Sequence, residues 1–330
     1  MIFSLTLNAA LDRFLYTERL TEDDTVRVER VKDYPAGKGV DVSRVVNELG
    51  GHSVSIAFLG GHTGKIVEEM LDEEGVVYAT VRSDKETRTN ILIETKKGQY
   101  RLSLPGPVIS NREVDKLFKT VDILLRKDDY LLLCGSVPEG VSNDIYRQLC
   151  SRMRGIGVNV YIDSDKEPFS EGVKAGPKGI KPNTHELQRL LKRDLKGESD
   201  LRRAVQEVSE KYSIEEVLLT MGAKGALALL SGSLYRINVP EVPVKSAVGA
   251  GDSFLAAYCM SRELGETAEV ALKMAGAASS AAVMTPGTEL CKYNDVIELL
   301  PTIEVKKAMM TFSAYHQRFC LLLEGSVSPS

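Results

Sequence analysis

The segment VGAGDSF (248–254) joins a glycine turn to an acid, and its residue types suit chemistry on a phosphate. Gly249 and Gly251 lead into an expected helix, whose unpaired first N–H groups and dipole favour a bound anion. Asp252 in the same turn carries a carboxylate, which a site that only stores phosphate would not need. The alternative is that Asp252 caps the helix, a common task for aspartate. These residues alone leave both interpretations open.

A second glycine turn, PAGKGVDVSR (35–44), has similar properties. Gly37 and Gly39 flank Lys38, so few side chains compete with a phosphate for the lysine. Asp41 follows in the expected helix. A lysine between glycines is also common in surface turns, and the motif gains weight only because the first one is present in the same chain.

Four polar residues lie where expected strands end or where a hairpin is expected. Asp12 in NAALD and Ser136 in CGSVPEG each follow a buried strand, and ligands bind at the carboxyl ends of parallel strands. Arg88 and Arg101 lie on the expected hairpin, and a guanidinium suits a phosphate. The alternatives are a helix or turn cap for Asp12 and ordinary surface positions for the arginines.

Two further segments suit a nucleotide and its metal. In KPNTHEL, Asn183 and Glu186 are three residues apart, so both reach one face at the start of a helix. An amide and a carboxylate there suit a magnesium shell that includes waters, and the alternative is a capping arrangement. In TMGAKGALAL, Gly222 and Gly225 separate two expected strands, which predicts a hairpin turn or a backbone pocket for the tail of a nucleotide.

Two other nucleotide motifs do not fit the sequence. GGHTGKI (60–66) has the wrong glycine spacing for a P-loop, and Ile66 follows its lysine where serine or threonine is required. The turn after the first expected strand, NAALD, contains no glycine, which argues against a dinucleotide-binding fingerprint.

The composition is that of an ordinary folded chain, and it argues against several classes of protein. The 330 residues are 43% hydrophobic and 27% charged, with a net charge of -4 and a pI of about 5.8. The sequence has no long Lys/Arg run, no apolar stretch of the ~18 residues that a membrane span needs and no secretory signal pattern. Its five scattered cysteines form no C-x-x-C pair, which favours a reducing compartment. We therefore expect a cytoplasmic protein with no nucleic-acid partner and no membrane partner.

Short apolar runs alternate with helical patterns along most of the chain, which predicts an α/β fold. Several runs are apolar on both faces, as in a parallel sheet that is covered on both sides. The expected strands are 2–7, 53–60, 130–134, 158–163, 216–220 and 226–230. The expected helices are 42–49, 63–74, 111–125, 142–154, 184–192, 199–211 and much of the chain after Asp252. This order predicts a doubly wound, mainly parallel sheet flanked by helices.

Two segments, about 13–35 and 87–104, carry few helical signals. RTNILIETKKGQYRLSL predicts two strands around a turn at Lys97-Gly98, and TVRVERVKDY alternates apolar and polar residues. Together they predict a small antiparallel sheet inserted beside the main domain as a lid or a dimer surface, with a solvated hairpin as the alternative. The main domain then spans 1–310, and 311–330 form a C-terminal extension.

Four motifs, taken in their order along the chain, resemble those of one family, the PfkB or ribokinase-like carbohydrate kinases. VGAGDSF is similar to the family's C-terminal signature and PAGKGVDVSRVVNELGG to its N-terminal one, while KPNTHEL and TMGAKGAL resemble its magnesium and nucleotide segments. TLNAALD, TRTNI, PGP, GSVPEGV and SAVGAGDS further resemble the phosphosugar branch. The chain is most similar to the 1-phosphofructokinases of that branch, with tagatose-6-phosphate and minor 6-phosphofructokinases close by.

The resemblance implies an ATP-dependent kinase that phosphorylates a primary hydroxyl of a ketohexose phosphate, most like fructose 1-phosphate going to fructose 1,6-bisphosphate. It implies that Asp252 accepts the proton of the attacking hydroxyl, beside the turn of Gly249, Ala250 and Gly251. The implied sugar-phosphate residues are Asp12, Gly37, Lys38, Gly39, Asp41, Arg88, Arg101 and Ser136, of which Lys38, Arg88 and Arg101 hold the phosphate. The implied ATP residues are Asn183, Glu186, Thr220, Gly222, Gly225 and Ala278, of which Asn183 and Glu186 hold Mg²⁺ through water.

The sequence departs from the family pattern at Asp41, where the family usually has asparagine. An ionised aspartate only accepts hydrogen bonds, so its contacts to sugar hydroxyls differ from those of an amide. Tagatose 6-phosphate, fructose 6-phosphate or a nucleoside are other acceptors, and a non-catalytic sugar-phosphate binding protein is the alternative from a different class. We also expect a homodimer through the lid strands, and family analogy alone implies a monovalent-cation site near TPGTEL (285–290).

Overall fold

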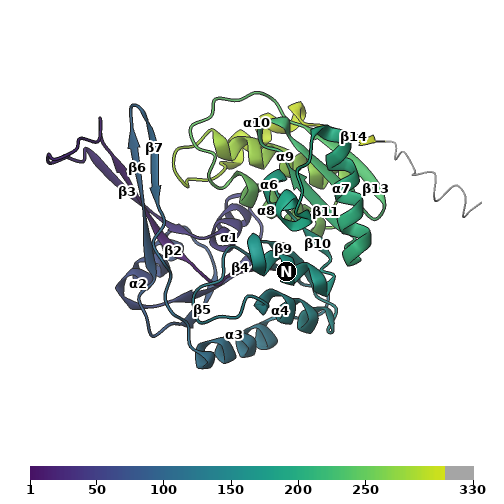
Figure 1. Cartoon of the computed structure of the whole chain (residues 1–330), viewed down its shortest axis with the longest axis horizontal. Coiled ribbons are helices and arrows are strands. Elements are labelled where there is room, and N and C mark those ends of the chain that lie inside the picture. The colour runs from purple at the N-terminus through teal and green to yellow at the C-terminus, as the bar shows by residue number, and fades with distance from the viewer. Residues whose placement is uncertain (309–330) are drawn as a thin grey trace, which may run out of the picture.

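One large sheet forms the centre of the molecule in the computed structural model, which describes residues 1–308 (Figure 1). Its ten strands are, in spatial order, β14 (Glu304–Ala308), β13 (Ser233–Asn238), β12 (Ala226–Leu230), β11 (Glu216–Thr220), β10 (Gly179–Ile180), β9 (Asn159–Asp163), β8 (Tyr130–Cys134), β1 (Ile2–Thr6), β4 (Ser53–Leu59) and β5 (Tyr78–Arg82). All pairs from β5 to β11 are parallel, and β12, β13 and β14 continue the sheet as antiparallel strands. The expected mainly parallel sheet is therefore confirmed.

The central strands bury both faces, which explains their unbroken apolar sequences. In β8, Leu131 and Leu133 point into one hydrophobic core, while Leu132 and Cys134 point into the other. Side chains alternate along a strand, so a strand that is covered on both sides has no polar face.

Helices cover both faces of the sheet. The first face carries α3 (Asn111–Leu124), α4 (Ile145–Arg154), α5 (Lys166–Gly172), α6 (Thr184–Leu191) and α7 (Gly197–Tyr212). The second face carries α1 (Lys38–Glu48), α2 (Gly61–Glu73), α8 (Ala250–Glu263), α9 (Ala268–Val283) and α10 (Tyr293–Leu299). Three short 3₁₀ turns lie at Val173–Ala175, Gly222–Lys224 and Leu300–Thr302. Within residues 1–308, no helix is both long enough and apolar enough to cross a membrane.

The six expected strands agree with the structure to within a residue at each end, whereas α1 begins four residues before its expected start. Gly37, the residue before α1, has a φ of 127° and lets the chain turn directly into the helix. A Cβ on Gly37 would also lie 2.6 Å from Cγ2 of Thr6. The strands that the sequence analysis did not identify, β5, β10, β13 and β14, are short or lie near an edge of the sheet.

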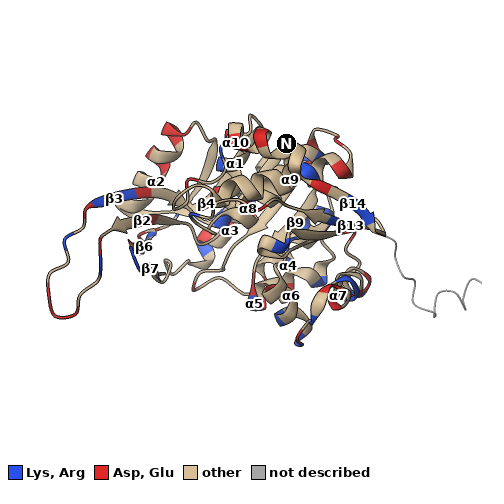
Figure 2. Cartoon of the chain, turned by 90° about the horizontal axis from the view of Figure 1, so that it is seen from above, with Lys and Arg blue, Asp and Glu red and all other residues tan. Residues whose placement is uncertain are grey.

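A second, smaller sheet lies beside the main body, and we call it the lid (Figure 1). Its order is β3 (Arg30–Ala36), β2 (Ala10–Tyr16), β6 (Arg88–Thr95) and β7 (Gly98–Leu102). The outer pairs are antiparallel as expected, but β2 and β6 in the centre are parallel. Asp12, expected in a turn after the first strand, lies inside β2 opposite Asn90. The loop between β2 and β3 projects from the body and carries acidic residues at its tip (Figure 2).

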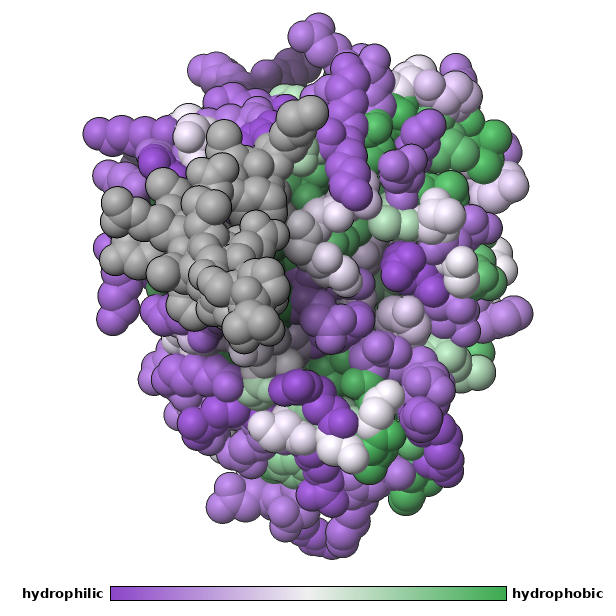
Figure 3. All heavy atoms as spheres, turned by 90° about the vertical axis from the view of Figure 1, so that its right-hand side faces the viewer, coloured by the Kyte–Doolittle hydropathy of each residue, from purple (hydrophilic) through white to green (hydrophobic). Residues whose placement is uncertain are grey.

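The surface and the cysteines agree with the composition. Figure 3 shows a face on which hydrophilic side chains predominate and hydrophobic ones lie in small groups. The four cysteines within residues 1–308 are buried and unpaired. The expected extension 311–330, including Cys320, lies outside the described residues.

The buried carboxylate of Glu216 provides a test of the packing between the sheet and α8. It accepts hydrogen bonds from the hydroxyls of Tyr161 at 2.7 Å and Tyr258 at 2.8 Å. Glu216→Ala leaves both hydroxyls buried without a partner, so we expect a loss of about 3 kcal/mol in the free energy of unfolding, measured by urea denaturation. Glu215→Ala, which removes an exposed partner of Lys178, is the matched control and should cost less than about 1 kcal/mol. Equal losses in the two variants would contradict this packing role.

Candidate active site

The candidate residues gather at one edge of the large sheet, where the parallel strands end. Asp163 is the last residue of β9, Lys181 directly follows β10, and Thr220 ends β11 and pairs with Asn183 through an isolated bridge. Ligands of open α/β sheets bind at this edge, because the strand ends and the starts of the following helices open a crevice there.

The turn at Gly249 starts α8 and leaves its first N–H groups unpaired within the helix. Gly249 has a φ of 78°, and a Cβ on this residue would lie 2.3 Å from Leu290. The N–H of Ser253 makes the first helical bond, to the carbonyl of Gly249. The N–H groups of Ala250, Gly251 and Asp252 precede it and remain available for an anion. No side-chain capping bond forms at this helix start, so Asp252 does not serve as the N-cap.

A cluster of opposite charges lies beside this turn. Asp163 is fully buried and has an ion pair with Lys38 Nζ at 2.7 Å and another with Lys181 Nζ at 3.0 Å. Lys38 also lies 3.6 Å from Oε1 of Glu186. A Cβ on Gly251 would lie 3.0 Å from Lys181 Nζ, which places this ammonium directly against the turn. The cluster therefore brings two cations to the start of α8.

The surroundings of Asp252 raise the pKa of its carboxyl. Burial, with repulsion from Asp163, raises the pKa of its carboxyl to about 6, while Lys38 and Lys181 oppose the rise. A carboxylate with a pKa near 6 is ionised at neutral pH and accepts a proton more readily than an exposed one.

Lys38 lies away from the two arginines with which the sequence analysis grouped it. Although burial opposes this, Asp163, Asp252 and Glu186 raise the pKa of Lys38 and keep it charged. Arg88 and Arg101 instead act on Asp12. The structure thus separates Lys38, near the start of α8, from Arg88, at the base of the lid, while Arg101 is exposed on β7 and donates two hydrogen bonds to Gln99.

The base of the lid forms a second polar group. Asp12 Oδ1 accepts a 2.8 Å hydrogen bond from Asn90, and Asn8 Nδ2 donates to Ser136 Oγ at 3.1 Å. Arg88 donates to the carbonyl of Asn8 at 3.0 Å. Burial raises the pKa of Asp12, while Asn90 and nearby arginines oppose the rise.

Three buried polar atoms in this group have no hydrogen-bond partner. They are Asn8 Oδ1, Arg88 Nε and Asn90 Oδ1. Buried polar atoms are almost always satisfied in folded proteins, so unpaired ones in a cluster indicate a ligand that supplies their partners. The set offers both a donor and acceptors, as a phosphorylated polyol requires.

Asp41 lies in the first turn of α1 and is 4% exposed. Burial, with repulsion from Asp252, raises the pKa of Asp41 well above its usual value, and Asp12 adds to the effect. Asp41 therefore connects the lid group to the Asp252 group. Gly39, two residues earlier, packs on β1, since a Cβ there would lie 2.5 Å from Thr6 Oγ1.

Asn183 and Glu186 form a reciprocal capping box at the start of α6. Asn183 Oδ1 accepts from the N–H of Glu186 at 2.9 Å, and Glu186 Oε2 accepts from the N–H of Asn183 at 2.7 Å. The capping alternative is thus confirmed, and Glu186 Oε1 is left to face Lys38. Among the described residues, no group of three or more His, Cys, Asp or Glu is arranged to hold a metal directly. The residues fit a metal held through water, since one carboxylate oxygen stays outside the capping bonds.

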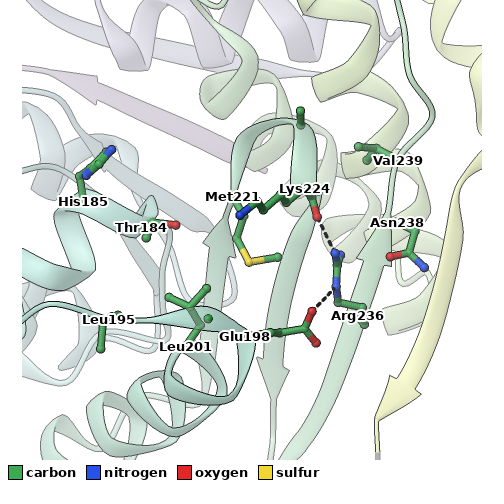
Figure 4. Close-up of a pocket in the computed structure, with 12 residues that line it drawn as sticks. Thr184, His185, Leu195, Glu198, Leu201, Met221, Lys224, Arg236, Asn238 and Val239 are labelled. Atoms are coloured by element: carbon green, nitrogen blue, oxygen red, sulfur yellow. Dashed lines mark hydrogen bonds and ion pairs between the residues drawn. The ribbon is translucent and has the colours of Figure 1, made fainter.

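The turn of Gly222 and Gly225 joins β11 to β12 as a hairpin, as expected. A pocket of about 610 Å³ opens beside it, between the starts of α6 and α7 and the end of β13 (Figure 4). It is lined by Thr184, His185, Leu195, Gly197, Glu198, Leu201, Met221, Ala223, Lys224, Arg236, Asn238 and Val239. Ala278, expected near a nucleotide base, lies on α9 with its side chain fully buried in the core, and it does not line this pocket.

Four site residues were not selected from the sequence: Asn8, Asn90, Asp163 and Lys181. Asn8 and Asn90 are in the quoted stretches NAALD and TRTN, while Asp163 ends the expected strand VNVYID and Lys181 begins KPNTHEL. A polar residue at the carboxyl end of each buried strand would have been a sufficient signal for Asp163.

Comparison with known proteins identifies relatives over nearly the whole chain. Residues 4–294 match the model of the pfkB family carbohydrate kinases. The ATP-dependent 6-phosphofructokinase isozyme 2 of Escherichia coli K12 is 32% identical over 297 residues, which cover 89% of this chain and 96% of the relative. The crystal structure of the E. coli phosphofructokinase-2 in complex with potassium superposes with a TM-score of 0.87, at 30% identity, over 91% of this chain and 98% of the other.

A more distant structure shares the fold. A Thermotoga maritima protein has a TM-score of 0.83 at 23% identity and covers 93% of this chain and 99% of its own. The residues that carry Asp252, the lysine pair and the lid all lie within residues 4–294, which match the family. The chain belongs to the pfkB family of carbohydrate kinases and is a phosphotransferase with an alcohol group as acceptor.

Proposed function

We propose that the protein transfers the γ-phosphoryl group of ATP to the free primary hydroxyl of a fructose monophosphate. The observation that carries this proposal is the position of Asp252, a buried carboxylate in the first turn of α8 beside unpaired N–H groups and two lysines. A base for the hydroxyl and positive partners for the phosphoryl group then lie within one turn of helix.

In this mechanism the attacking hydroxyl gives its proton to Asp252. The N–H groups of Ala250, Gly251 and Asp252 stabilise charge on the phosphoryl group as it moves. Lys38 and Lys181 lie at the same point and balance that charge, so Lys38 acts on the transferred group rather than on the phosphate that the sugar already carries. Both ammonium groups are held by Asp163, which keeps them in place without neutralising the pair.

The sugar lies between the lid and α1. Asp12, Asp41 and Ser136 orient its hydroxyls, and Arg88 and Arg101 hold its phosphate. The buried, unpaired Nε of half-buried Arg88 supports this assignment, because a phosphate oxygen would satisfy it.

The nucleotide lies along the same edge of the sheet. Its triphosphate faces Asn183 and Glu186, which would hold Mg²⁺ through water, and the metal would supply positive charge against the phosphates. Thr220, Gly222 and Gly225 flank the nucleoside end, for which the 610 Å³ pocket gives room. Ala278 packs α9 into the core and does not contact the nucleotide.

Fructose 6-phosphate is the acceptor that the relatives support best, because a protein 32% identical to this chain is an ATP-dependent 6-phosphofructokinase. Fructose 1-phosphate, expected from the sequence, yields the same bisphosphate. Each carbon that flanks the ring oxygen of fructofuranose carries a CH₂OH group, so the two monophosphates present similar shapes in opposite orientations.

Two further assignments follow from the same comparison. A monovalent cation lies near 285–290, where Thr288 Oγ1 is buried without a partner, and the E. coli phosphofructokinase-2 has been crystallised with potassium. The protein forms a homodimer through the lid, whose edge strand β7 exposes Tyr100 and Leu102. The E. coli phosphofructokinase-2 also has a tetrameric inhibited form.

Asp252→Asn tests the base. We expect turnover to fall roughly 10²- to 10⁴-fold while ATP binding, measured by calorimetry, is retained. Because the pKa of Asp252 is raised to about 6, kcat/KM of the unmodified protein should fall as the pH falls through 6. Asp295→Asn, which also alters the first turn of a helix, is the control. Near-normal turnover of Asp252→Asn would show that the base is elsewhere.

Replacement of Arg88 or Arg101 by methionine tests the phosphate contacts. Loss of a charge-assisted hydrogen bond should raise KM for the sugar phosphate about 10- to 100-fold and leave kcat/KM for neutral fructose little changed. Arg112→Met, on the exposed start of α3, should change neither constant. An equal loss on fructose and on its phosphates would refute the assignment.

A substrate panel tests the function itself. We expect kcat/KM for fructose 6-phosphate to exceed the values for fructose 1-phosphate and tagatose 6-phosphate, each measured by ATP consumption. The reverse order of the two fructose phosphates would assign the protein as a 1-phosphofructokinase. Binding of all three without ATP consumption would instead support a non-catalytic binding protein.

A further inference from the structure

Three carboxyl groups crowd the sugar side of the site, each from a different element. Asp12 on β2, Asp41 on α1 and Asp252 on α8 are 8%, 4% and 8% exposed. The charges of both Asp12 and Asp252 act on Asp41. Buried carboxylates that repel one another do not all ionise unless each has a cation of its own.

Arg44 is the cation that acts on Asp41, but its positive charge is already paired with another carboxylate. Its Nε and Nη2 form a two-point pair with Glu74 at 2.6 and 2.7 Å. Its Nη1 donates to the carbonyl of Thr288 at 2.9 Å, and reaches Oδ1 of Asp41 only at 3.4 Å. The positive charge of the guanidinium is therefore balanced mainly by Glu74 and not by Asp41.

The other two carboxyl groups have better support for a negative charge. Asp12 accepts a hydrogen bond from Asn90 and faces Arg88 and Arg101. Asp252 faces the lysine pair. Among the three, Asp41 is the group whose ionisation the structure supports least.

We propose that Asp41 binds the sugar as a neutral carboxylic acid. It holds a proton on Oδ2, the oxygen away from the Arg44 contact, and donates it in a hydrogen bond to a sugar hydroxyl. The ligand in this inference rests on the proposed function, but the neutral state of Asp41 does not. Burial and the charge of Asp252 raise the pKa of Asp41 well above its usual value, in agreement with the geometry.

The first test uses the protein without substrate, so it does not depend on the proposed function. A carboxyl whose pKa is higher in the folded state than in the unfolded chain loses stability as the pH rises between the two values, because only the unfolded chain has released the proton. Asp41→Asn cannot titrate. The melting temperature of Asp41→Asn minus that of the unmodified protein should therefore increase as the pH rises from about 5 to about 8. A constant difference over this range would overturn the proposal.

The second test measures the binding of fructose 6-phosphate by calorimetry without ATP. Above the pKa of Asp41, the unmodified protein must take up a proton to bind, so its Kd should rise ~10-fold per pH unit. Asp41→Asn should lack this part of the pH dependence. Equal pH dependence in the two proteins would refute the inference, whereas no binding by either protein at any pH would refute the proposed ligand instead.

Glu74 offers a third variant that leaves Asp41 in place. Glu74→Gln frees the charge of Arg44 for Asp41, favours the ionised acid and should move the loss of binding to lower pH. In the Asp41→Asn background, the same change should have no effect on the pH dependence. Glu73→Gln, one residue earlier and exposed, is the matched control. A shift of equal size in both backgrounds would show that Glu74 acts by another route.

Discussion

The fully buried carboxylate of Asp163 is the group on which the rest of the site depends. A carboxylate without solvent requires partners, because the cost of removing it from water exceeds what packing returns. Its partners are Lys38, from the start of α1, and Lys181, from the end of β10. Although burial opposes it, the two lysines keep the pKa of Asp163 below its usual value. One ionised group at the end of β9 thus fixes two cations from separate elements beside the turn at Gly249, where the proposed mechanism places the moving phosphoryl group.

That arrangement accounts for the combination of an acid with an anion-binding turn. Asp163 holds two ammonium groups at the start of α8, where the unpaired helix N–H groups also favour an anion. Asp252 enters this field and remains ionised at neutral pH despite its burial, because the lysines offset the desolvation and the repulsion from Asp163. A raised but still accessible pKa is what a proton acceptor requires, and a cap would need no such tuning.

The strands and the order of motifs could be predicted from the sequence, since buried parallel strands have apolar runs and glycine turns have few alternatives. The partners of each polar residue could not be predicted. Lys38 was placed with Arg88 and Arg101 because all three are basic, whereas its partner Asp163 lies 125 residues away and is reached only through the sheet. The parallel pairing of β2 with β6 was missed for the same reason, because strand direction depends on connections through the main sheet. Ala278 was assigned to the ATP site by the resemblance, and the sequence alone could not predict that its side chain is fully buried in the core.

The loop 285–290 contacts both the lid and the turn at Gly249. Glu289 accepts a hydrogen bond from Tyr34 of lid strand β3 at 3.1 Å and pairs with Lys32 of the same strand. The next residue, Leu290, packs so closely on Gly249 that no Cβ fits there. Two adjacent residues, Glu289 and Leu290, thus contact lid strand β3 on one side and the turn that carries Asp252 on the other. In the proposed mechanism, in which the lid group binds the sugar and the turn acts on the phosphoryl group, these contacts would let the position of the acceptor influence the geometry of the base.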